Sequence, residues 1–170
     1  MAVVVIKDEL DIESYIKTVV AGIPDIKAVE FVDVAPEELN DFVKSYFQNK
    51  YKGTVLFWGN YEEKLSTKQA LSWSTPQLQA TILSKYEKNR PDTIMAVRTA
   101  TKKLMLKFIH KIKADQEDTY NAAAGKGDNG KHWSFKLHND MIFPIGDMGG
   151  ATVRGWSIDF EIGFPVTEVV

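Results

Sequence analysis

The sequence predicts an α+β fold with a mainly antiparallel sheet, helices packed on one face, and one long helix in the C-terminal half. Apolar residues at helical spacing mark the long helix over about 93–114. Strict alternation of apolar and polar residues marks strands at 133–138 and 156–164. Because neighbouring strands follow one another without intervening helices, antiparallel pairing is favoured.

The first third of the chain predicts a helix, a strand and a second helix. Over 8–22, apolar residues recur at helical spacing, acidic residues crowd the first turns and Gly22 ends the helix. Residues 28–34 are rich in valine and predict a strand. Pro36 then opens the second helix, since proline fits a first helical turn, and its apolar stripe includes Phe42.

The middle of the chain predicts strands. Residues 54–58 form a short apolar run, and the Gly-Asn pair at 59–60 indicates a turn. A second extended stretch covers 69–86, where Pro76 predicts an edge strand or a bulge. Asp92 is the predicted N-cap of the long helix.

We expect a single domain over 1–170, with a mobile polar and Gly-rich loop at about 115–131 and another loop over 144–150. The predicted core joins the three helices to the last strand. Its members are Ile16, Phe42, Val97, Leu104, Phe108, Ile158 and Phe160.

The composition excludes several classes of protein. The chain has no cysteine, which excludes a disulfide framework, thiolate zinc sites and cysteine nucleophiles. No apolar run approaches the roughly 18 residues of a membrane span, so we expect no membrane partner. The short apolar start does not fit a signal peptide, because charged residues follow at once over 7–9.

The net charge of −2 hides an asymmetry. Residues 1–41 hold ten acids and three bases, whereas residues 98–113 hold six bases and no acid. On the predicted helix these bases lie opposite the apolar side, where they could meet an acidic protein surface or nucleic acid, or remain solvated. With two lysines of the following loop, the predicted interface consists of Arg98, Lys102, Lys103, Lys107, Lys111, Lys113, Lys126 and Lys131.

One motif is close to a phosphate-binding loop. Residues 125–131 read Gly, four residues, Gly and Lys, but His132 stands where the loop requires a hydroxyl. A helix precedes the motif and a strand follows it, which reverses the required order. We therefore expect no nucleotide or other cofactor.

Metal-binding and catalytic patterns are weak. Two histidines could join nearby aspartates at a metal, but six strand residues separate them by about 20 Å. Asp159 and Glu161, about 7 Å apart on one strand face, could suit an inverting glycosidase, although outward acids on such strands are commonplace. We expect no metal and no catalytic site. The metal candidates are His132, His138, Asp140 and Asp147.

Several segments carry a resemblance. They are an acidic first helix ending in Ala-Gly-Ile-Pro at 21–24, a strand pair at 54–58 and 71–85, the long helix at 94–113, and a closing strand at 155–162 with the pattern Gly-Trp-x-x-x-Phe-x-Ile. In these the chain resembles the tail terminator or tail completion proteins of long-tailed bacteriophages. The loops at 115–131 and 144–150 are longer than that family pattern.

The resemblance implies a small α+β subunit of the virion, assembled in the bacterial host cytoplasm, with no catalysis. Six copies would form a ring that caps the tail tube and joins it to the neck or head–tail joining protein, with DNA passing through the lumen. A ring needs a patch that meets a different patch on the next copy. The acidic 1–41 region and the basic 98–113 segment could supply them.

Two other classes remain open. One is a small cytoplasmic enzyme whose site is assembled from scattered residues. The other is a nucleic-acid-binding module that uses the lysine-rich helix side.

Overall fold

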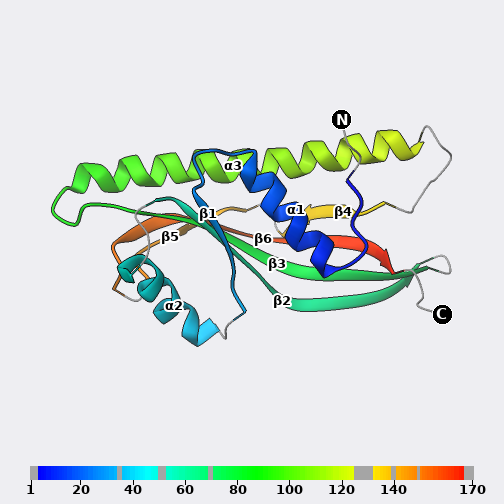
Figure 1. Ribbon diagram of the computed structural model, residues 1–170, viewed down its shortest axis with the longest axis horizontal. Coiled ribbons are helices and arrows are strands. Elements are labelled where there is room, and N and C mark those ends of the chain that lie inside the picture. Colours follow the sequence, from blue (N-terminus) through cyan, green and yellow to red (C-terminus); the bar gives the residue numbers. More distant parts are fainter. Residues whose placement is uncertain are drawn as a thin grey trace.

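The computed structural model describes residues 4–33, 36–49, 53–68, 71–124, 132–138, 141–148 and 150–166. Within them the fold is α+β, as predicted, with helices on both sides of a six-stranded sheet (Figure 1). The helices are α1 (Glu9–Ala21), α2 (Pro36–Asn49) and α3 (Pro91–Ala124). The strands are β1 (Ala28–Phe31), β2 (Val55–Lys68), β3 (Leu71–Lys85), β4 (Ser134–Leu137), β5 (Phe143–Ile145) and β6 (Val153–Val166).

The sheet is mainly antiparallel, which confirms the prediction. Its strands lie in the order β1-β2-β3-β6-β4, and β5 also pairs with β6. Only β1 and β2 run parallel among the described pairs, and α2 connects them. Such a connection has to cross over the sheet, which places its helix against one face.

β2 and β3 form a long hairpin that differs from the sequence prediction. The Gly-Asn pair at 59–60 lies inside β2, next to a shift in register, and makes no turn. Gly59 is needed because a Cβ there would lie 2.5 Å from the Val32 carbonyl oxygen. Pro76 lies in a central strand rather than an edge strand. The ladder between β3 and β6 has no pair at Pro76 and resumes at Gln77 after Ser74. Pro76 has no N–H to donate, and its pairing with β2 on the other side is kept.

The C-terminal strands agree with the predicted alternation. Trp133 and Phe135 are buried while Ser134 and Lys136 between and beside them are exposed. β6 buries its apolar side along its whole length and pairs with β3 at the centre of the sheet. β5, however, lies in the segment expected to be a loop, where Pro144 does not prevent pairing at the sheet margin.

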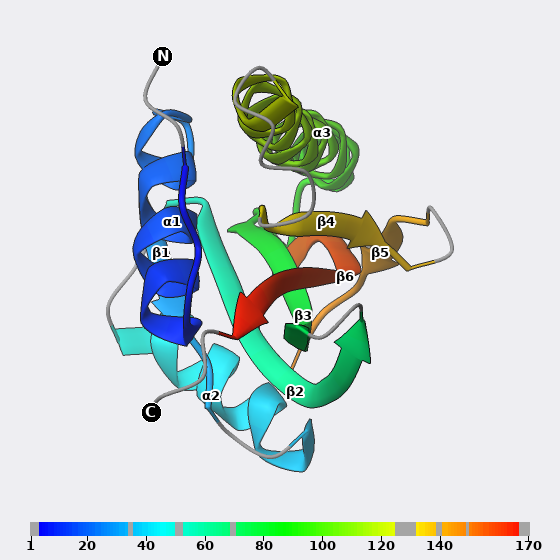
Figure 2. The same ribbon diagram turned by 90° about the vertical axis from the view of Figure 1, so that its right-hand side faces the viewer.

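The helices cover both faces of the sheet, whereas one face was predicted. α1 and α3 pack on one face, and α2 packs on the other, as Figure 2 shows. Five predicted core residues are buried together under α1 and α3: Ile16, Leu104, Phe108, Ile158 and Phe160. Val97 is only half-buried, and Phe42 packs at the opposite face against the cluster under α2. An apolar stripe shows that a helix packs, but not on which face.

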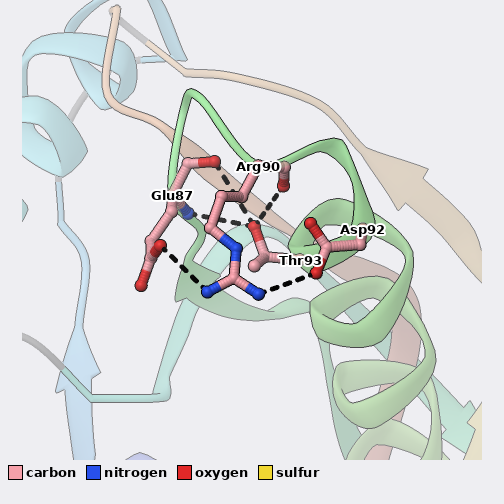
Figure 3. A network of polar contacts seen from close by, with 4 residues as sticks. All are labelled: Glu87, Arg90, Asp92 and Thr93. Atoms are coloured by element: carbon pink, nitrogen blue, oxygen red, sulfur yellow. Dashed lines mark hydrogen bonds and ion pairs between the residues drawn. The ribbon is translucent and has the colours of Figure 1, made fainter.

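α3 begins earlier than predicted, at Pro91, with Asp92 in the first turn rather than at the cap. A polar network fixes this start (Figure 3). The Thr93 hydroxyl donates to the Arg90 carbonyl at 2.7 Å and accepts from the Glu87 N–H at 3.2 Å. The Arg90 guanidinium donates to Asp92 at 3.0 Å and lies 3.8 Å from Glu87.

α3 also ends later than predicted, because residues 115–124 continue the helix. No glycine or proline interrupts this segment. The Lys111 ammonium lies 2.6 Å from Asp115 one turn on, and Thr119 is buried. The polar composition thus reflects the exposed side of a helix. The rest of the predicted loop, 125–131, lies outside the described residues. No helix among the described residues has the length and hydropathy needed to cross a membrane.

Candidate interaction surface

The six bases of 98–113 lie on the side of α3 away from the core, but they meet different surroundings. α3 runs along the long axis of the molecule (Figure 1), and its bases divide between two flanks. Arg98 and Lys102 lie over the ring of Trp156, whereas Lys103, Lys107 and Lys111 border a groove on the other flank. The basic side of the helix thus carries two different environments, and Lys113, which is exposed, belongs to neither.

Trp156 accounts for the first flank. The Arg98 guanidinium carbon lies 5.3 Å from the centroid of its ring, and the Lys102 ammonium lies 5.0 Å from it. The indole N–H donates to the Arg98 carbonyl at 2.8 Å. Both cations thus hold α3 against β6 through cation–π attraction, which gives them a structural role.

The second flank is an open groove of about 700 Å³ between α3 and the turn 22–24 that follows α1. Leu106, 40% exposed, contributes an apolar surface to it. Lys103, Lys107, His110 and Lys111 line the groove on one side of Leu106 and give that side positive charge. We call this feature the basic groove.

Part of the charge in the basic groove is balanced within the chain. The Lys107 ammonium lies 3.6 Å from the Asp25 carboxylate, and both side chains are mostly exposed. Lys111 pairs with Asp115. No ion pair is found for Lys103 among the described residues. The Lys107 pair is exposed and contributes about 0–1 kcal/mol, so Lys107 can exchange its partner at little cost, whereas the Asp115 carboxylate that pairs with Lys111 is only 13% exposed.

The start of α1 has the opposite character. The Asp8 carboxylate caps the helix by accepting the Asp11 N–H at 2.8 Å, and acids in the first turn favour the positive helix end. Among these acids Leu10 is 72% exposed, because it points away from the buried side of α1. Glu9 and Glu13 lie on one flank of the helix beside it, and Glu13 pairs with Lys17. We call Glu9, Leu10 and Glu13 the acidic knob.

A buried contact joins the two helices that carry these features. The Tyr15 hydroxyl of α1 donates to the Asp115 carboxylate of α3 at 3.0 Å. Burial raises the pKa of the Tyr15 hydroxyl far above its usual range, and the Asp115 charge and hydrogen bond raise it further. The acidic knob and the basic groove therefore sit on helices that are fixed to each other.

The other predicted candidates lie apart from this surface. His132 packs edge-on against Tyr120, with ring centroids 5.3 Å apart. The His138 Nε2 lies 3.7 Å from Glu161, and Asp147 pairs with Arg154 at 2.7 Å. No group of three or more potential metal ligands occurs among the described residues. Lys126, Lys131, Asp140 and the motif 125–131 lie outside them.

The carboxylate pair of β6 is held by amides. Gln79 donates to Asp159 at 2.9 Å, and Gln77 donates to Glu161 at 3.1 Å. Both glutamines belong to β3, so these bonds run across neighbouring strands. The arrangement is that of an amide–carboxylate ladder on a sheet face.

Sequence reasoning missed the apolar centres of both features. Leu10 and Leu106 each fall outside the apolar stripe of their helix, and that position off the stripe is the signal that could have found them. The number of lysines in the helix indicates its charge but does not indicate that Leu106 is exposed among them. The sequence matches no protein-family model and no curated protein.

Proposed function

We propose that this chain is a structural protein of phage assembly, a ring-forming tail terminator that joins the tail tube to the neck. Its partners are then further copies of itself, six in a ring, the tail tube protein and a neck or head–tail joining protein. DNA passes through the lumen. The protein is then located in the tail or neck of the virion, which is assembled in the cytoplasm of the bacterial host.

The observation that carries the proposal is the basic groove. Its exposed leucine and its three lysines suit a macromolecular surface that supplies an apolar side chain with acids beside it, because complementary charges set the register of such contacts. The α+β fold and the order of its elements agree with what the resemblance implies.

The direct test is to measure the mass of purified protein by mass photometry and to view it by negative-stain microscopy. Rings of about six subunits that cap isolated tail tubes are the expected result. A chain that stays monomeric at every concentration and leaves tail tubes uncapped would contradict the proposal. Stabilisation of such a monomer by a small metabolite would favour the enzyme instead.

A charge-neutral variant tests the role of the basic groove. Changing Lys103, Lys107 and Lys111 to Gln removes three charges. The changes at Lys103 and Lys107 should alter the free energy of unfolding by less than about 0.5 kcal/mol each, and the change at Lys111 should cost more because it leaves the largely buried Asp115 carboxylate without its cation. Assembly of the variant should weaken, and assembly of the wild type should weaken as salt rises. The matched control changes the exposed Lys64, Lys88 and Lys136 to Gln, which removes equal charge elsewhere. If both variants assemble equally well, the lysines of the groove are solvated and take no part in assembly.

DNA is the other polyanion that the lysines could meet. Retention of a labelled duplex by the wild type, lost in the groove variant and kept in the control, would favour the nucleic-acid-binding class. Such binding should fall steeply with salt, because each neutralised phosphate releases counterions.

A further inference from the structure

The chemistry of the basic groove defines what can occupy it. The groove is open and is lined by the exposed Leu106, by three lysines and by the turn 22–24. A matching surface has one protruding apolar side chain with carboxylates beside it. An apolar side chain alone would leave the lysines without partners, and acids alone would leave Leu106 exposed to water.

The acidic knob has this form. Leu10 is exposed on α1, and Glu9 and Glu13 lie on one flank of the helix beside it. The side chain is held away from the core because Ile12 and Ile16 bury the opposite side of the helix. Leu10 is 72% exposed and borders a shallow groove together with Phe31 and Trp58, so most of its apolar side chain contacts water within the described part of the chain.

We infer that the basic groove of one copy receives the acidic knob of a second copy of this chain. Leu10 then packs on Leu106, and Glu9 and Glu13 approach Lys103 and Lys107. Lys103, which has no ion pair among the described residues, gains one, and Lys107 exchanges its exposed pair with Asp25. The contact rests on the proposed assembly of copies into a ring.

The two halves cannot meet within one copy. Leu10 and Gly22 lie at opposite ends of α1, about 18 Å apart at the helical rise of roughly 1.5 Å per residue. α1 shares one core with α3 and the sheet, and Tyr15 also bonds to Asp115, so α1 is held in place beside α3. Every copy therefore presents an unused knob and an unused groove, and a contact of this kind can repeat from copy to copy.

The absence of cysteine allows a direct test. One chain carries Leu10→Cys, and a second, of different length through a tag, carries Leu106→Cys. Both positions are exposed, so neither change disturbs the core. After mild oxidation of the mixture, the mixed disulfide should form at least about tenfold faster than in the control, because a disulfide requires Cα atoms within roughly 4.4–6.8 Å. The control mixes L10C with Met95→Cys, which is exposed on the same helix outside the groove.

A charge swap then tests the register. Adding Glu9→Lys to the L10C chain should lower the yield of mixed disulfide, and adding Lys103→Glu to the L106C chain should restore it. If Glu9→Lys lowers the yield and Lys103→Glu does not restore it, Glu9 does not pair with Lys103.

Failure of this contact differs from failure of the proposed function. Rings in the microscope, with no excess of the mixed disulfide over the control, overturn the contact and leave the function standing. An excess of the disulfide without rings or capped tubes supports the contact and contradicts the tail terminator. The absence of both overturns both, and then an acidic segment of another protein or DNA becomes the occupant to test.

Discussion

The two faces of the sheet are closed in different ways. Under α1 and α3, which lie on the same side of the sheet (Figure 2), apolar residues from β2, β3, β4 and β6 form one core. Under α2, a smaller cluster joins Val43 and Phe47 to one end of the sheet. Farther along this second face, Gln77, Asp159 and Glu161 replace apolar residues. The first face therefore supplies most of the burial on which the fold depends.

The largest effect is expected at the centre of the first face. Phe108 is fully buried, and its ring meets that of Phe160 at 6.4 Å. Phe108→Ala should lower the free energy of unfolding by about 3–5 kcal/mol, as other such truncations do. Urea titration measures the change. Leu106→Ala, two residues away and exposed, is the control and should cost less than about 0.5 kcal/mol. Equal losses would contradict the packing of α3 on the sheet.

A smaller and more local effect is expected on the second face. Phe47 packs edge-on against Phe57, with ring centroids 6.1 Å apart. Phe47→Ala should cost about 3 kcal/mol, at the lower end of the range, because fewer buried residues surround it. Hydrogen exchange should quicken in α2 and leave the β3–β6 ladder protected. Equal loss of protection in both regions would mean that the two faces unfold as one unit.

A polar contact fastens the first face at its margin. Tyr15→Phe removes the hydrogen bond to Asp115 and should cost about 1–2 kcal/mol near neutral pH. Tyr46→Phe, which removes a hydroxyl that donates to Glu30 at 2.9 Å on the α2 side, is a matched comparison and should cost less because that site is more exposed.

The Tyr15 contact also predicts a pH dependence. Because the folded state raises the pKa of the Tyr15 hydroxyl, the unfolded chain loses this proton at about pH 10 while the folded chain keeps it. The stabilisation is complete below about pH 10 and declines as the pH rises above it. Denaturant titrations at pH 9 and pH 11 should show a larger decline for the wild type than for Tyr15→Phe. Parallel declines would contradict the raised pKa.

The smallest effect concerns the cations over Trp156. Arg98→Ala and Lys102→Ala should each lower the free energy of unfolding by about 0.5–1 kcal/mol. Lys113→Ala, on the same helix and with no aromatic contact among the described residues, should change it less. If Lys113→Ala lowers the melting temperature as much as Arg98→Ala does, the contacts of Arg98 and Lys102 with Trp156 do not stabilise the fold.

Periodicity predicted the elements well and their ends less well. The stripe of α3 and the alternation of β6 depend on many buried positions, so they are readable without the fold. The polar residues 115–124 gave no such pattern, because only one side of an exposed helix end contacts the core. Gly59 was interpreted as a turn, although its actual constraint is the close approach of Val32, a residue distant in sequence.

The candidate surface was only partly predictable. Counting lysines located α3 correctly, but the division into two flanks depends on Trp156 and on the turn 22–24, which come from other parts of the chain. The side of the sheet that α2 covers also depends on the crossover from β1 to β2. Pairings between distant segments decide these features, and a linear pattern does not contain them.

The position of β6 has a consequence for the order of folding. β6 follows β3, β4 and β5 in the chain, yet it is the strand that pairs with all three. During synthesis β4 and β5 therefore have no strand to pair with, and the apolar side of α3 has only part of its sheet, until β6 has been made. Pairings such as Leu78 with Phe160 also close long loops, which slows folding. The sheet is therefore completed in one late step, and nascent chains that stop before β6 should expose the α3 stripe to chaperones.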